Sequence, residues 1–335
     1  MRAVIQDRYG APDALRVDDV ETPVPRDDEV LVQVRAASVH PDVWHVVTGR
    51  PAALRLMGSG LLRPQCRVPG TDLAGVVAAV GARVTGFRPG DEVFGDSLRG
   101  FSWRNGGAYA EYAAAPEDGL AHKPANVTFE QAAAVPTTGY IALLNLPAGR
   151  LRPGQRVLVN GAAGGVGAIV VQILRSHGAH VTGVEHTRKL DLLRSLGADA
   201  VVDYTTDDFT RGDQRYDLIV DIPGNHPYAA VRRALAPDGT YVLIGHDHFG
   251  QVGRRWLGSL PRFGGLALRS LFAPQLRKGE PASRRKKEAM AALRGYLESG
   301  ALTPVIDRAY PLAEAGEAIR HLAEDEPLGR VVLTV

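Results

Sequence analysis

Two patterns of apolar and polar positions divide the chain. In residues 1–124, short apolar runs are separated by turn residues, and the clearest runs cover 30–34, 75–80 and 92–94. This pattern predicts an all-β region. From about residue 125, strand-like apolar runs alternate with segments long enough for helices. Such alternation is typical of βαβ units and therefore predicts a parallel sheet.

The elements expected in this second region follow one another in order. Expected strands cover 156–160, 180–184, 200–202, 217–221 and 240–244, and expected helices cover 165–177, 188–196 and 228–235. In the first of these helices the apolar residues recur at helical spacing. Pro237-Asp238-Gly239 predicts a turn before the last strand. The order of elements predicts a doubly wound domain.

The last part of the chain is less regular. Residues 246–282 mix Gly, Pro, Arg and Leu without a clean period and receive no assignment. Residues 283–299 predict a helix that ends before Gly300, and 331–335 predict a final strand. We expect this strand to return to the first β region.

Length and charge limit the possible partners. With 335 residues, 45% hydrophobic and 23% charged, the chain is long enough for two sizeable domains. Its 39 Lys and Arg residues nearly balance 37 Asp and Glu residues, so the formal net charge is +2. No overall field favours nucleic acid or an anionic membrane, and any polyanion site must be local. The basic run 284–287 is expected to be a solvated helix start, so we expect no nucleic-acid partner.

Cysteine usage and the N-terminus bear on the compartment. Cys66 is the only cysteine, which excludes a disulfide within the chain and any zinc site built from several thiolates. The first residues lack the pattern of a secretion signal, and no run of about eighteen apolar residues occurs. We therefore expect a cytoplasmic protein with no membrane partner.

A glycine-rich segment joins the first strand of the second region to its first helix. Residues 160–167 read NGAAGGVG, in which Gly164 and Gly167 occupy the second and third positions of the dinucleotide fingerprint. Such a loop turns tightly and directs the helix N-terminus at a pyrophosphate. Expected cofactor contacts come from Gly161, Gly164, Gly165, Val166 and Gly167. A glycine turn with a purely structural role is the alternative.

Further motifs lie along nearly the whole chain. They are PGTDLAGVVAAVG at 69–81, FRPGDEVFG at 87–95, GGAYAEY at 106–112, LRPGQRVLVNGAAGGVG at 151–167, LLRSLGAD at 192–199 and YDLIVDIPG at 216–224. Together they resemble the medium-chain dehydrogenase/reductase superfamily, specifically its zinc-free quinone oxidoreductase (zeta-crystallin-like) branch.

The resemblance implies a fold and a reaction. The fold is α/β, with a GroES-like catalytic β domain formed by 1–124 and 300–335 and a Rossmann doubly wound parallel-sheet domain over 125–299. A nicotinamide cofactor would bind between them and pass a hydride to a small molecule, either a quinone or an α,β-unsaturated carbonyl compound. Similar reductases form homodimers through the Rossmann sheet, and 266–272 is the apolar candidate for that contact.

The same resemblance also indicates whether the chain binds a metal ion. Zinc-dependent relatives carry Cys and Gly-His-Glu ligands in the first domain, where this chain reads Gly70-Thr71-Asp72. Cys66 alone cannot complete a three-ligand site, so we expect no zinc. Without a metal to stabilise an alkoxide, reduction of a quinone or conjugated carbonyl is favoured. The alternatives are a metal-independent carbonyl or alcohol dehydrogenase, and a protein that binds NADPH or RNA without turnover.

The end of the second expected strand carries opposing signals for the cofactor. Glu185 would accept hydrogen bonds from the adenosine ribose, which favours NADH. Thr187, Arg188 and Lys189 would bind a 2′-phosphate, which favours NADPH. We predict NADPH and keep NADH as the alternative.

The resemblance also assigns residues to both ends of the cofactor. Tyr204 would lie near the adenosine phosphate, and Gly245 beside the cofactor at a strand end. His40, where similar enzymes often have Asn, would donate a hydrogen bond or a proton to the substrate. Thr138 would lie beside the nicotinamide. The alternatives are a histidine satisfied within the fold and a threonine that caps a helix.

Overall fold

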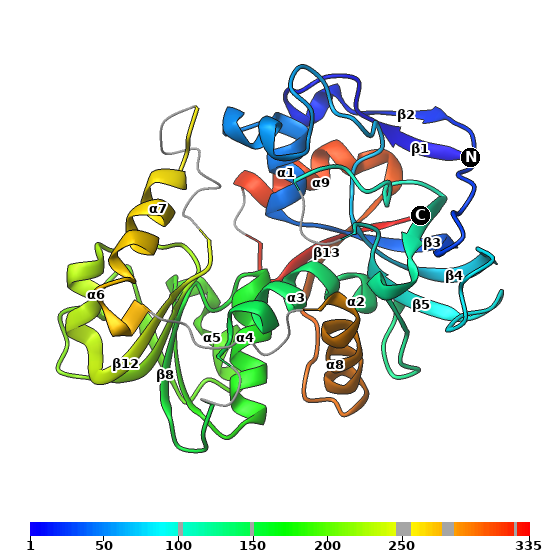
Figure 1. Ribbon diagram of the computed structural model, residues 1–335. Helices are drawn as coiled ribbons and strands as arrows, with labels where there is room; N and C mark the ends of the chain where they lie inside the picture. The colour runs from blue at the N-terminus through cyan, green and yellow to red at the C-terminus, as the bar shows by residue number, and fades with distance from the viewer. Residues whose placement is uncertain (100–102, 148–150, 246–255, 277–284, 325–326) are drawn as a thin grey trace. The chain divides into compact units, whose positions relative to one another are not determined.

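The computed structural model describes residues 1–99, 103–147, 151–245, 256–276, 285–324 and 327–335 (Figure 1). The chain divides into two units, which are Met1–Thr137 with Arg285–Val335, and Thr138–Arg284. The first is built on a mainly antiparallel sheet and the second on a parallel one. The expected α/β fold, with a β domain and a doubly wound parallel-sheet domain, is therefore confirmed.

The described residues of the first unit form a seven-stranded sheet in the order β13-β14-β3-β4-β5-β7, with β6 paired to β3. The strands are β3 (Glu29–Val39), β4 (Asp72–Val80), β5 (Glu92–Asp96), β6 (Tyr112–Pro116), β7 (Leu120–His122), β13 (Ile306–Pro311) and β14 (Arg330–Thr334). A separate ladder pairs β1 (Arg2–Ile5) with β2 (Arg16–Asp19). β14 pairs antiparallel with β3, so the end of the chain does return to the first β region.

Helices interrupt the strands of the first unit. Their bounds are α1 (Pro41–Thr48), α2 (Phe129–Ala133), α8 (Lys286–Glu298) and α9 (Ala315–Glu324). α1 follows directly from β3, with Pro41 in its first turn, where a missing backbone donor costs nothing. Five of its eight residues are buried. The prediction of an all-β region is therefore wrong at this helix.

The described residues of the second unit form a parallel five-stranded sheet in the order β10-β9-β8-β11-β12. The strands are β8 (Arg156–Asn160), β9 (His180–Glu185), β10 (Ala200–Asp203), β11 (Tyr216–Asp221) and β12 (Leu235–Leu243). The helices are α4 (Gly165–Ser176), α5 (Leu190–Ser195), α6 (Tyr228–Ala234) and α7 (Leu260–Arg269), and α3 (Pro136–Asn145) begins at the unit boundary. The strand order matches that of a doubly wound dinucleotide fold.

Two elements of this unit differ in detail from the prediction. The expected helix over 188–196 is a turn of 3-10 helix, Thr187–Lys189, followed by α5. The expected turn at 237–239 lies inside β12, because Leu235 pairs with Tyr216 whereas Thr240 pairs with Leu218. The extra residues on β12 form a bulge.

The unit boundaries also differ from the expected domain boundaries. We expected domain changes at 124/125 and 299/300, whereas the structure changes units after Thr137 and before Arg285. The reason is packing, because α2 lies against β3 and β4, and α8 lies against β7. Both helices therefore complete the first unit.

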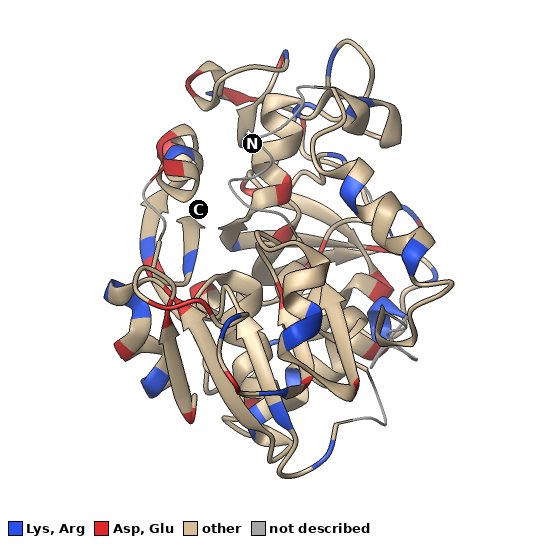
Figure 2. Ribbon diagram, turned by 90° about the vertical axis from the view of Figure 1, so that its left-hand side faces the viewer, with Lys and Arg blue, Asp and Glu red and all other residues tan. Residues whose placement is uncertain are grey.

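Charged residues of both signs are interspersed along the elements of both units (Figure 2). This distribution agrees with the near balance of 39 basic and 37 acidic residues. Among the described residues, no helix combines the length and apolar character that crossing a bilayer requires.

Candidate functional site

The glycine-rich loop forms a tight turn between β8 and α4. Gly161 has φ +76°, and a Cβ there would lie 2.9 Å from Pro223 Cδ. The backbone N–H groups of Gly161 and Ala162 both donate to Val184 O, at 3.1 and 3.3 Å. The loop is therefore held against the end of β9, as the fingerprint requires.

The other two fingerprint glycines have different surroundings. A Cβ on Gly167 would lie 2.1 Å from Gly161 O, so only glycine lets α4 approach the loop this closely. A Cβ on Gly164, which precedes the first residue of α4, would contact only Gly161 O at 3.5 Å. Gly164, Gly165 and Val166 are partly exposed at the N-terminus of this helix. Open space beside unpaired N–H groups fits the pyrophosphate of a dinucleotide.

Glu185 ends β9 beside this loop. Its Oε1 accepts a hydrogen bond from Ala163 N at 3.4 Å, and its Oε2 accepts one from His186 N at 3.0 Å. The residue is only 7% exposed. A carboxylate fixed in this way can accept further hydrogen bonds from ribose hydroxyls.

The residues expected to hold a 2′-phosphate have other contacts. Thr187 Oγ1 donates to Asp203 Oδ2 at 2.5 Å, and this bond lowers the pKa of Asp203. Lys189 is buried, at 6% exposure. The backbone N–H of Arg188 donates to His186 Nδ1 at 3.3 Å. The structure thus groups these residues near Glu185 but places a second carboxylate among them.

Two further predicted cofactor residues lie at the ends of strands. Tyr204, directly after β10, is 45% exposed, and its ring lies edge-on to His186 at 5.7 Å between centroids. Gly245 follows β12 and donates its N–H to Ile222 O at 3.0 Å. Both lie at the carboxyl ends of parallel strands, where ligands bind in doubly wound folds.

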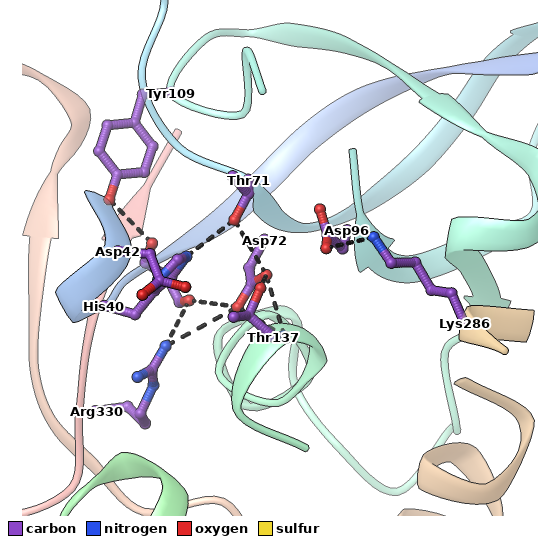
Figure 3. Close-up of polar contacts among 10 residues, drawn as sticks. His40, Asp42, Thr71, Asp72, Asp96, Tyr109, Thr137, Lys286 and Arg330 are labelled. Carbon is purple, nitrogen blue, oxygen red and sulfur yellow. Dashed lines mark hydrogen bonds and ion pairs between the residues drawn. The ribbon is translucent and has the colours of Figure 1, made fainter. Parts of the chain in front are cut away.

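A buried polar network in the first unit surrounds His40, which directly precedes α1 (Figure 3). His40 Nε2 lies 2.9 Å from Thr71 Oγ1. Asp72 accepts hydrogen bonds from Ser38 Oγ at 3.0 Å, from Thr137 N at 3.2 Å and from Thr137 Oγ1 at 2.5 Å. All five residues are at most 8% exposed.

Arg330 on β14 completes the network. Its Nη2 donates to Ser38 Oγ at 2.9 Å and lies 3.9 Å from Asp72 Oδ2. Burial raises the pKa of Asp72 above its ordinary value, because it outweighs the opposing effects of the Arg330 guanidinium and of the hydrogen bonds from Thr137. The hydroxyl of Tyr109 donates to Ser38 O at 2.9 Å, which fixes the same strand from another side.

The hydrogen bonds of this network indicate which ring nitrogen of His40 carries the proton. Thr71 Oγ1 donates to Asp72 Oδ1 at 3.4 Å, so it accepts a hydrogen bond from the N–H at Nε2 of His40. His40 Nδ1 is then unprotonated, and it has no hydrogen-bond partner among the described residues. The nearest acidic oxygen is Asp42 Oδ2, at 4.0 Å. Burial lowers the pKa of His40 well below its ordinary value.

Asp42 is an acid beside this network whose pKa is raised. It lies in the first turn of α1, and its side chain is 24% exposed. Burial and the neighbouring Asp72 carboxylate raise the pKa of Asp42 to about 7, although Arg330 opposes the shift.

Thr71 and Asp72 stand where the resemblance led us to look for zinc ligands. Thr71 and Asp72 are engaged with His40 and Thr137, as described above. Within the residues that the structure describes, no three His, Cys, Asp or Glu side chains gather in a way that could hold a metal ion. Cys66 donates its thiol to Val68 O instead, at 3.5 Å.

The two predicted catalytic residues belong to different units. His40 lies in the first unit, whereas Thr138 begins the second, in the first turn of α3, and both are 2% exposed. Sequence reasoning did not identify Arg330 or the role of Asp72 as the network centre. Arg330 and Ser38 are 292 positions apart, and no local pattern links them.

Comparison with known proteins shows that this chain matches two family models and is similar to proteins of known activity. Residues 26–125 match the family described as Alcohol dehydrogenase GroES-like domain, and residues 196–333 match the family described as Zinc-binding dehydrogenase. An NADPH-dependent alkenal/one oxidoreductase of Arabidopsis thaliana is 30% identical, over 99% of this chain and 79% of its own length. A quinone oxidoreductase of Sus scrofa is 29% identical, over 95% of this chain and 92% of its own.

Solved structures show the same likeness. The structure of an NAD-dependent alcohol dehydrogenase is 31% identical to this chain and superposes with a TM-score of 0.80. The match covers 100% of both chains.

The fingerprint glycines allow folding and cofactor binding to be tested separately. Gly167→Ala should destabilise the protein by about 1–3 kcal/mol, because the added Cβ meets backbone. Gly164→Ala should leave the melting temperature unchanged and weaken dinucleotide binding about tenfold, roughly 1.4 kcal/mol. Thermal unfolding and fluorescence titration measure the two effects. Equal cofactor affinity in Gly164→Ala and the wild type would place the dinucleotide elsewhere.

The Asp72 network predicts a large and coupled loss of stability. Asp72→Ala should cost about 3–5 kcal/mol, because it leaves the Arg330 guanidinium buried without its partner. In the Asp72→Ala background, Arg330→Met should lower the free energy of unfolding much less than it does in the wild type, because it removes the guanidinium that has lost its partner. Urea unfolding of the wild type, both single variants and the double variant gives the coupling energy. Strictly additive costs would show that the two side chains do not interact.

Proposed function

Because the chain belongs to the medium-chain dehydrogenase/reductase superfamily, in its quinone oxidoreductase branch, we propose that it is an NADPH-dependent reductase of quinones or α,β-unsaturated carbonyl compounds. The observation that carries the proposal is the open space beside Gly164 at the N-terminus of α4. NADPH, when bound, supplies a hydride from its nicotinamide ring. The names of the Arabidopsis thaliana and Sus scrofa relatives support the two classes of acceptor.

We propose that the cofactor is held mainly by the second unit. The backbone of the glycine-rich loop and the first turn of α4 would hold the pyrophosphate. Glu185 would accept from the adenosine ribose, with Tyr204 nearby, and Gly245 would border the cofactor at the end of β12. Thr187, Arg188 and Lys189 would hold a 2′-phosphate only after Thr187 releases Asp203.

We propose that the reaction needs no zinc. During reduction of a conjugated acceptor, negative charge develops on its oxygen, and hydrogen-bond donors can stabilise that charge in place of a metal. Thr138 is our candidate for such a donor. His40 would act as one only after its Nε2–H releases Thr71. Activity should therefore survive chelation, and stoichiometric zinc whose removal abolishes activity would contradict this part of the proposal.

We propose Asp42 as the source of the proton that the reduced acceptor takes up. Its carboxyl is partly exposed and lies 4.0 Å from the unprotonated Nδ1 of His40. The O–H of the carboxylic acid would transfer its proton to the enolate, or to the anionic oxygen of the hydroquinone anion, leaving a carboxylate on Asp42. Water would then return a proton to Asp42, so the proton balance closes over each turnover.

We further propose a homodimer in the cytoplasm. β12 is an edge strand of the described sheet, and the segment 266–272 exposes Leu268 by 64% and Phe272 by 84%. Apolar side chains exposed beside a sheet edge suit a contact between two copies. Light scattering that gives the mass of one chain at micromolar concentration would contradict the dimer, and secretion of the tagged protein would contradict the location.

A metal-independent carbonyl or alcohol dehydrogenase that uses NADH is the second candidate. Two observations favour it, the position of Glu185 beside the dinucleotide loop and the likeness to an NAD-dependent alcohol dehydrogenase structure. The two candidates differ in the atom of the acceptor that receives the hydride, which is a conjugated carbon in one and a carbonyl carbon in the other.

Label transfer tests the proposed reaction. The purified protein is incubated with 4-deuterated NADPH or NADH and a panel of quinones, enones and aldehydes, and NMR locates the label. We expect deuterium on the β-carbon of an enone. Deuterium on the carbonyl carbon would favour the second candidate, and no transfer to any acceptor would favour a protein that binds the cofactor without turnover.

Glu185 should set the balance between the two cofactors. Like charges about 4 Å apart repel by roughly 4 kcal/mol at an effective dielectric near 20, so the carboxylate opposes a 2′-phosphate. Glu185→Ser should therefore lower the Kd for NADPH by about tenfold or more and raise the Kd for NADH. Fluorescence titration measures both constants. Arg188→Gln serves as the matched variant, and it should weaken NADPH alone.

The pH dependence of turnover should follow Asp42. Because the pKa of Asp42 is raised to about 7, its carboxyl holds the proton below that pH and loses it above. With an enone, kcat should be level at low pH and fall above about pH 7, and Asp42→Asn should lower kcat on the order of 100-fold with a flat profile. An unchanged midpoint in Asp42→Asn would assign the titration to another group.

A further inference from the structure

In the first unit, the end of a 3-10 helix (Ala52–Met57) and the loop that follows it carry large apolar side chains that the fold leaves exposed. Four large apolar side chains lie within seven residues of the chain and are at least half exposed. They are Leu56 at 75%, Met57 at 50%, Leu61 at 62% and Leu62 at 85% exposure. We call these four residues the apolar tip. Single exposed apolar residues are common on proteins, whereas a group of four in one short loop suggests a binding surface.

The apolar tip is carried by a loop with a fixed framework. Leu54 is buried at 6% exposure and anchors the loop to the unit. The hydroxyl of Tyr9 donates to Gly60 O at 2.5 Å, and Arg55 Nε donates to Gly49 O at 2.9 Å. The Arg55 guanidinium also lies 4.4 Å from the centroid of the Tyr9 ring. These contacts hold the backbone on the inner side of the loop, so the tip side chains stay directed outward.

Along the sequence, the charge around the apolar tip has one sign, although Arg67 pairs with Asp7 from another part of the chain. Residues 43–71 include four arginines and no Asp or Glu. At the chain average of 37 acidic residues in 335, a stretch of this length would hold about three. Arg50 and Arg63 are exposed, and among the described residues neither takes part in an ion pair. The loop is therefore basic although the whole chain is nearly neutral.

Contrary to the expectation of no membrane partner, we propose that the apolar tip inserts into the surface of an anionic lipid bilayer and docks the protein there. Interfacial binding needs apolar side chains that reach the acyl boundary and basic side chains that meet anionic headgroups. The loop offers both within 50–67, and it requires no membrane-spanning segment. The low net charge does not prevent docking, because a headgroup senses charges only within about one Debye length, roughly 8–10 Å.

Charge also argues against a second copy of the chain as the occupant. Two copies joined through this loop would place the arginines of one opposite the arginines of the other, since a twofold contact pairs a surface with itself. A bilayer instead supplies an apolar layer and an anionic layer together. An acidic protein partner would satisfy the arginines but would give no binding to lipid alone.

Vesicle sedimentation tests this proposal on the full chain without cofactor. The two probes are vesicles of phosphatidylcholine alone and vesicles that also contain phosphatidylserine. We expect binding to the anionic vesicles and much weaker binding to the neutral ones. Leu61→Ser/Leu62→Ser and Arg50→Gln/Arg63→Gln should each reduce binding to the anionic vesicles by about tenfold or more.

Val24 provides a matched control for these variants. It is 87% exposed in the same unit, yet it lies in a stretch with acidic residues at 18, 19, 21, 27 and 28. Val24→Ser should bind vesicles as the wild type does. Equal binding to both kinds of vesicle, equal loss in Val24→Ser and Leu61→Ser/Leu62→Ser, or no binding at all would each overturn the proposal.

Kinetics with a water-soluble quinone distinguish a docking surface from a wall of the substrate site. Leu61→Ser/Leu62→Ser should leave kcat and KM for that quinone unchanged, and a raised KM would overturn the proposal. The vesicle experiment does not depend on the proposed function, because it needs no turnover. A protein that docks on vesicles but reduces no acceptor would contradict only the proposed reaction.

Discussion

The buried carboxylate of Asp72 is the constraint on which the first unit depends. A charge in the protein interior is stable only while hydrogen bonds and a partner charge replace the water that it has lost. The hydrogen bonds to Asp72 come from Ser38 on β3 and from Thr137 at the start of α3, and its partner charge is Arg330 on β14. Because these segments are far apart in the sequence, the two ends of the chain must close around one charge. The return of β14 to β3 therefore satisfies the carboxylate as well as the sheet.

The second unit could be predicted more fully because its signals are local. Each strand and helix has its own apolar period, and the glycine loop is defined by neighbours in the chain. In the first unit, α1 has only eight residues, of which five are buried, and it follows an eleven-residue strand without a break. Its nearly continuous burial leaves no helical alternation to detect. The Asp72 network has no local signal, because Arg330 and Ser38 meet across 292 positions.

Near the adenosine end of the expected cofactor site, the sheet register gives Thr187 a different partner from the one that the sequence predicts. Glu185 and Asp203 are register partners at the ends of β9 and β10, so parallel pairing places them on neighbouring strands. In the sequence, Thr187 follows Glu185 closely and reads as a phosphate ligand. In the structure its hydroxyl donates to Asp203, which comes from the next strand. A 2′-phosphate would therefore meet two carboxylates, whereas the hydroxyls of an unphosphorylated ribose would meet two acceptors.

The charges of the first unit also explain why the carboxyl group of Asp42 retains its proton up to a pH of about 7. Three carboxyl groups, on Asp42, Asp72 and Asp96, interact electrostatically in its interior. Asp72 has the Arg330 guanidinium and hydrogen bonds from Thr137, and Asp96 has Lys286 Nζ at 2.7 Å (Figure 3). Two cations cannot balance three carboxylates, and like charges in a low dielectric cannot all stay ionised. Among the described residues Asp42 forms no ion pair with a Lys or Arg, and burial together with the Asp72 carboxylate raises the pKa of Asp42 to about 7, beside Nδ1 of His40.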